Sequence, residues 1–70
     1  MNQGQAAQLL TMKDVSAMTQ ISESTLRYYR NLGNKGPASA LLGGKIMYRK
    51  QDVEKWINEQ FEKEEKSHGH

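Results

Sequence analysis

The sequence predicts a mostly α-helical domain with one small β-hairpin, and three observations carry that prediction. Two short segments with apolar residues at helical spacing lie close together between residues 12 and 32. A glycine pair, Gly43-Gly44, separates two short apolar runs, which is typical of a two-residue hairpin. A third helical pattern follows over residues 51–62. The order helix, tight turn, helix, hairpin, helix is that of a winged helix-turn-helix, with the hairpin as the wing.

Length and composition indicate one small domain. The 70 residues include no cysteine and only two histidines, His68 and His70, so we expect neither a disulfide framework nor a metal site. We expect one domain over residues 9–62, a disordered lead over residues 1–8 and a flexible charged tail over residues 63–70. No apolar run approaches the about 18 residues of a membrane span and no signal-peptide pattern opens the chain, which favours a cytoplasmic protein without a membrane partner.

The first helix is expected over residues 12–18. The Thr11 hydroxyl can cap its first turn, and Asp14 three residues later completes a capping-box pattern. Three apolar residues at helical spacing then give one buried stripe: Met12, Val15 and Met18. Residues 19–21 are expected to form the turn, with Ile21 buried inside it.

The second helix is expected over residues 23–32, and its two faces differ in chemistry. Ser22 is placed to cap this helix, Glu23 lies at the positive end of the helix dipole, and Gly33 stops it. On a helical wheel, the half suited to a core carries Thr25, Leu26, Tyr29 and Leu32. The opposite half is polar and basic and carries Ser24, Arg27, Arg30 and Asn31, with Tyr28 at the border.

The hairpin and the third helix complete the expected core. Pro37 sets an extended start for the first apolar run, and the glycine pair tolerates the positive φ that a tight hairpin turn requires. The third helix, over residues 51–62, carries four apolar residues at helical spacing: Val53, Trp56, Ile57 and Phe61. Trp56 is the largest apolar group available to the core.

The middle of the chain is strongly basic, although the formal net charge is only +2. From Arg27 to Lys50 there is no acidic residue and there are six basic ones: Arg27, Arg30, Lys35, Lys45, Arg49 and Lys50. Positive charge gains most on a helix that enters a DNA groove and on a hairpin that follows the backbone. We therefore expect double-stranded DNA as the partner, with residues 23–32 in the major groove and wing residues 41–49 at the minor groove.

An enzyme is disfavoured, and no cofactor is expected. The part of the chain with regular pattern holds no histidine and no cysteine. Its carboxylates fall at helix caps or on helix faces that we expect to be exposed, and they do not suggest a converging site.

The segment from Ser22 to Tyr29 (SESTLRYY) resembles the recognition helix of the MerR superfamily of winged-helix DNA-binding proteins. A longer series over about residues 9–60 resembles more closely the small excisionase-type (Xis/AlpA-like) helix-turn-helix proteins of phages and actinobacteria. That series comprises Leu9-Leu10-Thr11, Thr25-Leu26-Arg27, GNKGP over residues 33–37, Leu42-Gly43, Tyr48-Arg49 and DVEKWI over residues 52–57. Two features depart from these families. The sequence does not continue into the dimerisation helix and effector domain of full-length MerR regulators, and Gly44 stands where relatives usually carry Arg or Lys.

The helical wheel and the resemblance together give the candidate DNA-binding residues: Ser22, Ser24, Thr25, Arg27, Tyr28, Arg30, Asn31, Lys35, Gly44, Lys45 and Arg49. Arg27 is the best candidate for a bidentate contact to guanine or for a phosphate clamp. Alternatives stay open for some of these residues. Arg27 and Arg30 can simply solvate a helix face, the Thr25 hydroxyl can bond to its own backbone, and the Tyr28 hydroxyl can lack a phosphate partner. Tyr48 and Trp56 fall on apolar periods and are expected in the core.

The resemblance implies a recombination directionality factor, or excisionase. Such a protein binds repeated sites in attachment DNA, bends the DNA and assists a cognate integrase, and it can self-associate cooperatively on the DNA. The alternative is a small AlpA-like or MerR-like transcriptional regulator that uses the same surface. Both hypotheses place the protein at the nucleoid of a bacterial cell. A third hypothesis is an interaction adaptor whose basic face meets an acidic protein.

Overall fold

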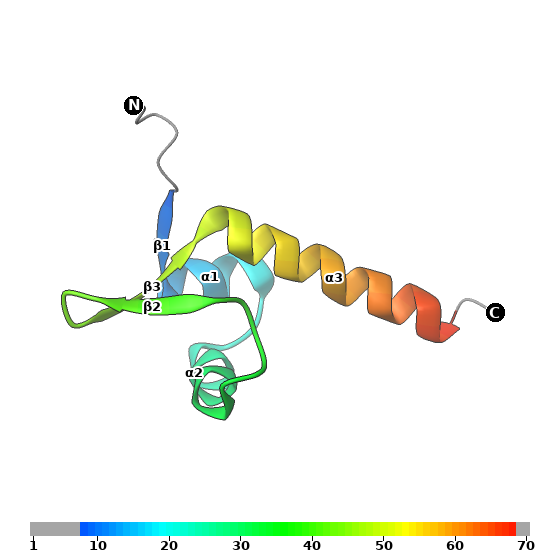
Figure 1. Cartoon of the computed structure of the whole chain (residues 1–70), viewed down its shortest axis with the longest axis horizontal. Coiled ribbons are helices and arrows are strands. Elements are labelled where there is room, and N and C mark those ends of the chain that lie inside the picture. The colour runs from blue at the N-terminus through cyan, green and yellow to red at the C-terminus, as the bar shows by residue number, and fades with distance from the viewer. Residues whose placement is uncertain (1–7, 69–70) are drawn as a thin grey trace.

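Three helices and three short strands make up residues 8–68, the part of the chain that the computed structural model describes, with side chains described for residues 8–65 (Figure 1). The elements are β1 (Leu9–Thr11), α1 (Met12–Thr19), α2 (Glu23–Leu32), β2 (Ser39–Leu42), β3 (Lys45–Arg49) and α3 (Lys50–His68). The predicted fold class is confirmed: two short helices joined by a tight turn are followed by a hairpin and a third helix.

The sheet has three strands, one more than the sequence predicted. It is antiparallel in the order β1-β3-β2, so that Tyr48 on β3 pairs with Leu10 on one side and with Ser39 on the other. Just before β1, the Gln8 carbonyl accepts a hydrogen bond from the Lys50 N–H at 2.8 Å. The expected lead therefore ends before Gln8, and residues 1–7 lie outside the described part of the chain.

Both short helices begin and end as their sequences predict. Thr11 and Asp14 form a full capping box, with N–H to side-chain oxygen distances of 3.0 and 3.1 Å. The hydrogen bonds from the Thr11 backbone and side chain lower the pKa of the Asp14 carboxyl. Gln20 ends α1 in the left-handed conformation (φ 66°), and Gly33 ends α2 in the same region (φ 84°). The left-handed Gln20 turns the chain from α1 to α2.

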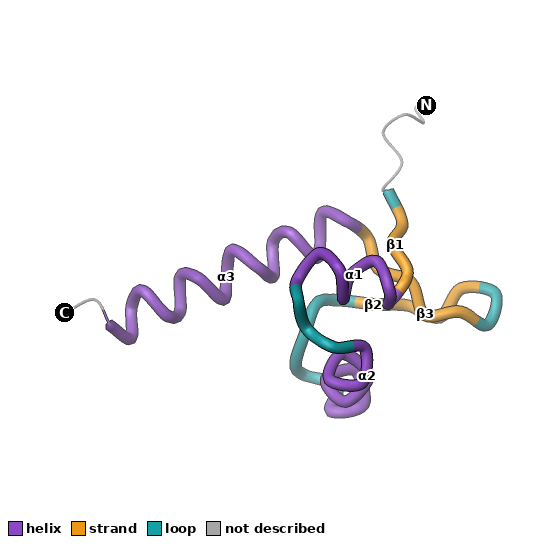
Figure 2. The backbone as a smooth tube through the Cα atoms, turned by 180° about the vertical axis from the view of Figure 1, so that it is seen from behind, coloured by secondary structure: helices purple, strands orange, loops and turns teal. Residues whose placement is uncertain are grey.

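The core lies where α1, α2 and the start of α3 meet one face of the sheet (Figures 1 and 2). Its buried side chains are Met12, Val15, Leu26, Tyr48 and Val53. Four half-buried residues pack around them: Leu10, Ile21, Ile46 and Ile57. The expectation that Tyr48 belongs to the core is confirmed, because only 2% of this residue is exposed.

Four apolar residues that were expected in the core lie at its edge or outside it. Trp56 is only half-buried, whereas Met18, Leu32 and Phe61 are exposed. Met18 is next to the last residue of α1, so the buried stripe of that helix is limited to Met12 and Val15. Leu32 is the last residue of α2, and Leu26 is the residue of this helix that is buried. Phe61 lies on the part of α3 that runs past the body of the domain, so helical spacing is kept but no neighbouring element is there to cover it (Figure 1).

α3 is also longer than expected, since it runs to His68 rather than ending near Glu62. The residues beyond Glu62 are mostly glutamate and lysine, which are good helix formers, and Glu59 stands four residues before Lys63. The expected tail over residues 63–70 is therefore helical as far as residue 68, and residues 69–70 lie outside the described part.

Candidate nucleic-acid interface

The N-terminal turn of α2 is held by a local network of hydroxyl groups. The Ser22 hydroxyl accepts a hydrogen bond from the Thr25 N–H at 3.2 Å and donates to Thr25 Oγ1 at 3.0 Å. Ser24 Oγ lies 3.3 Å from Ser22 Oγ. The Thr25 hydroxyl thus accepts a hydrogen bond from the cap serine, a partner that the sequence analysis did not consider. Ser22 and Thr25 thus fix the start of α2, while Ser24 is exposed.

Arg27 stands on the open face of α2. Its side chain is exposed, and within residues 8–65 no carboxylate forms an ion pair with it. Asn31, one turn later, and Tyr28 are also exposed, with 59% of Tyr28 accessible. This face offers a guanidinium, an amide and a phenol to any partner that approaches α2. These are the donor groups that read base edges and bind phosphates.

Arg30 is less exposed than the helical wheel predicted. It is half-buried, and its Nε is fully buried without a hydrogen-bond partner. The residue lines a cleft of about 460 Å³ whose other wall is the loop over residues 33–39. Its guanidinium is therefore a cation held in a groove between α2 and the loop that follows it, rather than a free surface charge.

Tyr48 connects the two arginines of α2 to the hairpin. Burial raises the pKa of the Tyr48 phenol, and the positive charges of Arg30 and Arg27 act on it in the opposite direction. The phenol therefore keeps its proton at neutral pH, and both arginines lie near this point of β3. The sequence pattern identified Tyr48 as core and could not show that the charges of Arg30 and Arg27 act on its phenol.

Lys35 is positioned by the loop that follows α2. Its Nζ lies 5.5 Å from the centre of the Tyr29 ring, and that ring lies 6.5 Å from the Trp56 ring. Gly36 has a φ of 79°, and a Cβ there would stand 3.0 Å from the Tyr29 Cβ, so the loop needs glycine to pass over this ring. Lys35 is exposed beyond the C-terminal end of α2 and extends the basic surface there.

The hairpin turn is built as predicted. Gly43 (φ 56°) and Gly44 (φ 83°) form it, and Lys45 follows directly, exposed and in register with Leu42. No carboxylate within residues 8–65 forms an ion pair with Lys45. Lys45 is thus the free cation nearest the tip of the wing, as expected from the glycine at position 44.

Arg49, the second wing cation, forms an ion pair with a carboxylate. Its Nε donates to Asp52 Oδ2 at 2.7 Å, in an ion pair whose arginine side chain is 57% exposed and whose aspartate is 21% exposed. Asp52 lies in the first turn of α3, two residues beyond the acid-free stretch. The sequence analysis grouped Arg49 with Lys45 as a wing cation and did not foresee its ion pair. The pair forms because α3 begins directly at the end of β3, so that the first carboxylate of α3 lies close to Arg49.

Other kinds of site find little support in the described residues. Within residues 8–68 no group of three or more His, Cys, Asp or Glu residues is arranged to hold a metal ion. The side chain of His68 and all of His70 lie outside the described part. None of the described helices is both long and apolar enough to cross a membrane.

Comparison with known proteins agrees with this geometry. The family model described as a helix-turn-helix domain matches residues 9–60, which extend from β1 into α3. No curated protein and no solved structure gives a significant match. The matched part includes both short helices, their turn and the complete hairpin. The chain therefore belongs to the helix-turn-helix domain family, which implies that it binds DNA.

Proposed function

We propose that the protein is an excisionase, a recombination directionality factor that binds repeated sites in attachment DNA, bends the DNA and assists a cognate integrase. The observation that carries the DNA-binding part is the presence of unpaired, exposed cations on both α2 and the hairpin. Arg27 and Lys45 are exposed without an ion pair among the described residues, and Arg30 lines the groove between α2 and the loop over residues 33–39. The excisionase role is supported by the ordered resemblance of residues 9–60 to the small Xis/AlpA-like proteins.

In the proposed complex, α2 enters the major groove. Arg27 makes a bidentate contact to guanine, and Asn31 and Ser24 flank it. Tyr28 and Lys35 contact the phosphates beside the groove, and Ser22 with Thr25 holds the end of the helix toward the DNA.

The wing contacts the next minor groove. Lys45 lies against its phosphates beside the Gly43-Gly44 turn, and Arg49 follows as a weaker contact because Asp52 competes for it. Arg30 stays in the groove between α2 and the loop over residues 33–39, where a phosphate would be attracted by the charge of its guanidinium.

Footprinting across candidate attachment DNA tests the proposal. We expect protection at repeated sites, and an affinity whose logarithm falls against log salt with a slope of roughly −4 to −5, for four to six phosphate contacts. A plasmid excision assay with the cognate integrase should then require the protein. Protection confined to a promoter, with excision unaffected, would favour the small AlpA-like regulator, whose recognition helix would be the same. Absence of DNA binding at low salt would leave only the adaptor hypothesis.

A further inference from the structure

We propose that Leu41 is a specificity-determining residue of the wing, whose side chain inserts between two base pairs in the minor groove and selects a flexible pyrimidine–purine step. This role rests on the proposed function, because it requires DNA at the wing. Leu41 is absent from the candidate DNA-binding residues, since neither charge nor hydrogen-bonding capacity marks it in the sequence. What marks it in the structure is its direction and its exposure.

Leu41 points to the side of the sheet that carries the core. It pairs with Ile46, and the next pair on the same side joins Ser39 and Tyr48. Paired residues, and residues two apart on one strand, share a side of the sheet, so Leu41 has the same direction as the buried Tyr48. Ile46 is half-buried and packs against the core. Leu41 is 63% exposed, because the hairpin runs on past the helices toward its turn (Figures 1 and 2).

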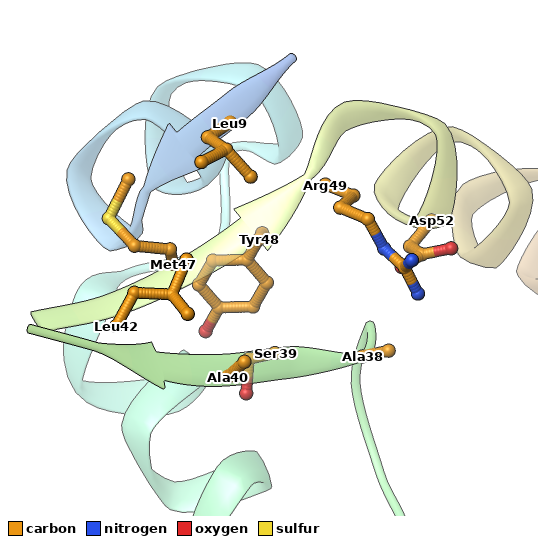
Figure 3. Close-up of a pocket in the computed structure, with 9 residues that line it drawn as sticks. All are labelled: Leu9, Ala38, Ser39, Ala40, Leu42, Met47, Tyr48, Arg49 and Asp52. Carbon is orange, nitrogen blue, oxygen red and sulfur yellow. The ribbon is translucent and has the colours of Figure 1, made fainter. Parts of the chain in front are cut away.

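Leu42 gives a direct comparison, because it is the same residue type one position later. Alternation along the strand directs it to the opposite side of the sheet, where it lines a cleft with Ala40 and Met47 (Figure 3). Leu42 is 46% exposed. The two leucines are therefore exposed neighbours on opposite faces of one hairpin, and Leu41 is the one that points to the side of the helices.

DNA bound to α2 lies on the side to which Leu41 points. Leu26 of α2 belongs to the same buried cluster as Tyr48, so α2 packs on the core side of the sheet, and its exposed face around Arg27 is turned away from the sheet. β2, which carries Leu41, is the edge strand next to α2 (Figures 1 and 2). A duplex that contacts Arg27 and then passes the wing therefore meets the face of Leu41 rather than that of Leu42.

The tip of the wing carries no side chain in front of Leu41. Gly43 and Gly44 form the turn, and nothing stands within 4 Å of the positions that their Cβ atoms would occupy. The minor groove is about 6 Å wide, and a turn without side chains is the narrowest form that a hairpin can present to it. Lys45, which pairs with Leu42 across the turn, remains available for the phosphates at the edge of the groove.

A leucine side chain has neither donor nor acceptor, so Leu41 cannot read base edges by hydrogen bonds. Apolar side chains act in the minor groove as wedges that separate stacked base pairs. Burial of the leucine surface offsets part of the cost of unstacking. That cost is low at flexible pyrimidine–purine steps such as TA and CA, and high in stiff A-tracts. Leu41 therefore favours a TA or CA step under the wing through the deformability of the DNA.

Fluorescence of a base analogue tests the insertion directly. The wing is first located on the footprinted site with an iron chelate on Leu42→Cys, a single attachment point because the natural chain has no cysteine. Aminopurine, a fluorescent analogue of adenine, then replaces the adenine of the step under the wing. We expect the wild-type protein to raise its fluorescence, because unstacking relieves quenching, and Leu41→Ala to lose this rise. Leu42→Ala is the matched control and should behave as the wild type. A rise that Leu41→Ala retains, or that Leu42→Ala loses equally, would overturn the insertion.

Step preference gives the second test. Replacing a TA step by AA at the located position should lower wild-type affinity at least about fivefold, the lower end of the effect of one altered base pair. Leu41→Ala should bind both duplexes equally, whereas Leu41→Met keeps an apolar side chain and should keep the preference, as should Leu42→Ala. Both leucines are exposed, so we expect each variant to fold, which circular dichroism verifies. A preference that survives in Leu41→Ala, or repeated sites without a pyrimidine–purine step under the wing, would contradict the role of Leu41.

The outcomes distinguish this contact from the DNA-binding proposal. If the wild-type protein binds its site and Leu41→Ala changes neither fluorescence nor step preference, the insertion is refuted and the DNA interface stands. If Leu41→Ala weakens binding to the TA and AA duplexes equally and the wild type shows no fluorescence rise, Leu41 only supports the hairpin, and the insertion is also refuted. If Leu41→Ala binds DNA as the wild type does but fails in excision, Leu41 contacts a protein instead. A wild-type protein that binds no duplex refutes both proposals.

Discussion

α2 and the wing come from the same acid-free stretch of sequence, yet their positive charges are not equally available. On α2, Arg27 is exposed and no described carboxylate pairs with it. On the wing, Lys45 is free but Arg49 is paired with Asp52 at 2.7 Å. The difference shows that a cation is available to a partner only if the fold places no carboxylate next to it. Asp52 is close in sequence, but its effect comes from the way α3 starts at the end of β3.

The Arg49–Asp52 pair weakens the wing without removing it from the interface. An exposed ion pair of this kind contributes about 0–1 kcal/mol, so a DNA phosphate can compete with the carboxylate for the guanidinium. Gly44 acts in the same direction, because it leaves Lys45 as the one cation in the turn segment over residues 42–45. We therefore expect α2 to supply most of the affinity and the wing to supply a smaller, salt-sensitive part.

The largest expected effect is that of Arg27→Ala. Removing a bidentate base contact costs about 1–3 kcal/mol, so specific affinity should fall by about 5- to 150-fold and become undetectable at moderate salt. Mobility shift with the footprinted site and with a scrambled duplex measures it. Because Arg27 is exposed, the thermal unfolding midpoint should stay unchanged. Unaltered affinity for the specific site would show that α2 does not read the groove through this residue.

Arg30→Ala should have a smaller effect on affinity and a larger effect on stability. The half-buried stem of Arg30 packs between α2 and the loop over residues 33–39, so its removal loses packing as well as charge. We expect a several-fold loss of affinity and an unfolding free energy lower by about 1 kcal/mol, measured by urea denaturation. Arg30→Lys is the informative control, since it keeps the charge. If Arg30→Ala changes affinity and stability in the same way as Arg27→Ala, both arginines act as exposed DNA contacts. The placement of Arg30 in the groove would then be wrong.

Lys45→Ala tests the wing. A single phosphate contact should cost a few-fold in affinity equally for specific and scrambled DNA, and should reduce the salt slope by roughly 1. Arg49→Ala should do less, because the wild-type arginine already has a carboxylate partner. Equal effects of Lys45→Ala and Arg49→Ala on affinity would contradict the expectation that Lys45 contributes more to DNA binding than Arg49.

Much of this fold could be predicted from local sequence patterns, whereas its long-range consequences could not. The Thr11 and Ser22 caps, the Gly33 stop and the Gly43-Gly44 turn depend on neighbouring residues, and all of them are confirmed. β1 is three residues long and becomes a strand through pairing with β3, a partner nearly forty residues away along the chain.

The same limit applies to burial. Helical spacing predicts which side of α3 is apolar, but not where the neighbouring elements stop, so it places Val53 correctly and Phe61 wrongly. In the candidate site, residue types on α2 predicted the exposed face around Arg27. They could not show that Arg30 lines a groove formed with the loop over residues 33–39 or that Arg49 pairs with Asp52.

The smallest effect, and the most direct comparison of wing with helix, is expected for Asp52→Asn. This change keeps the shape of the side chain and removes the charge that competes for Arg49, so Arg49 becomes available to phosphate and the salt slope should steepen by up to roughly 1. Removing a negative charge near the DNA acts in the same direction, and the double variant Asp52→Asn with Arg49→Ala separates the two causes. If the gain passes through Arg49, the double variant should lose it. If the double variant keeps the gain, Asp52 acts only by repelling DNA, and Arg49 has no place in the wing contact.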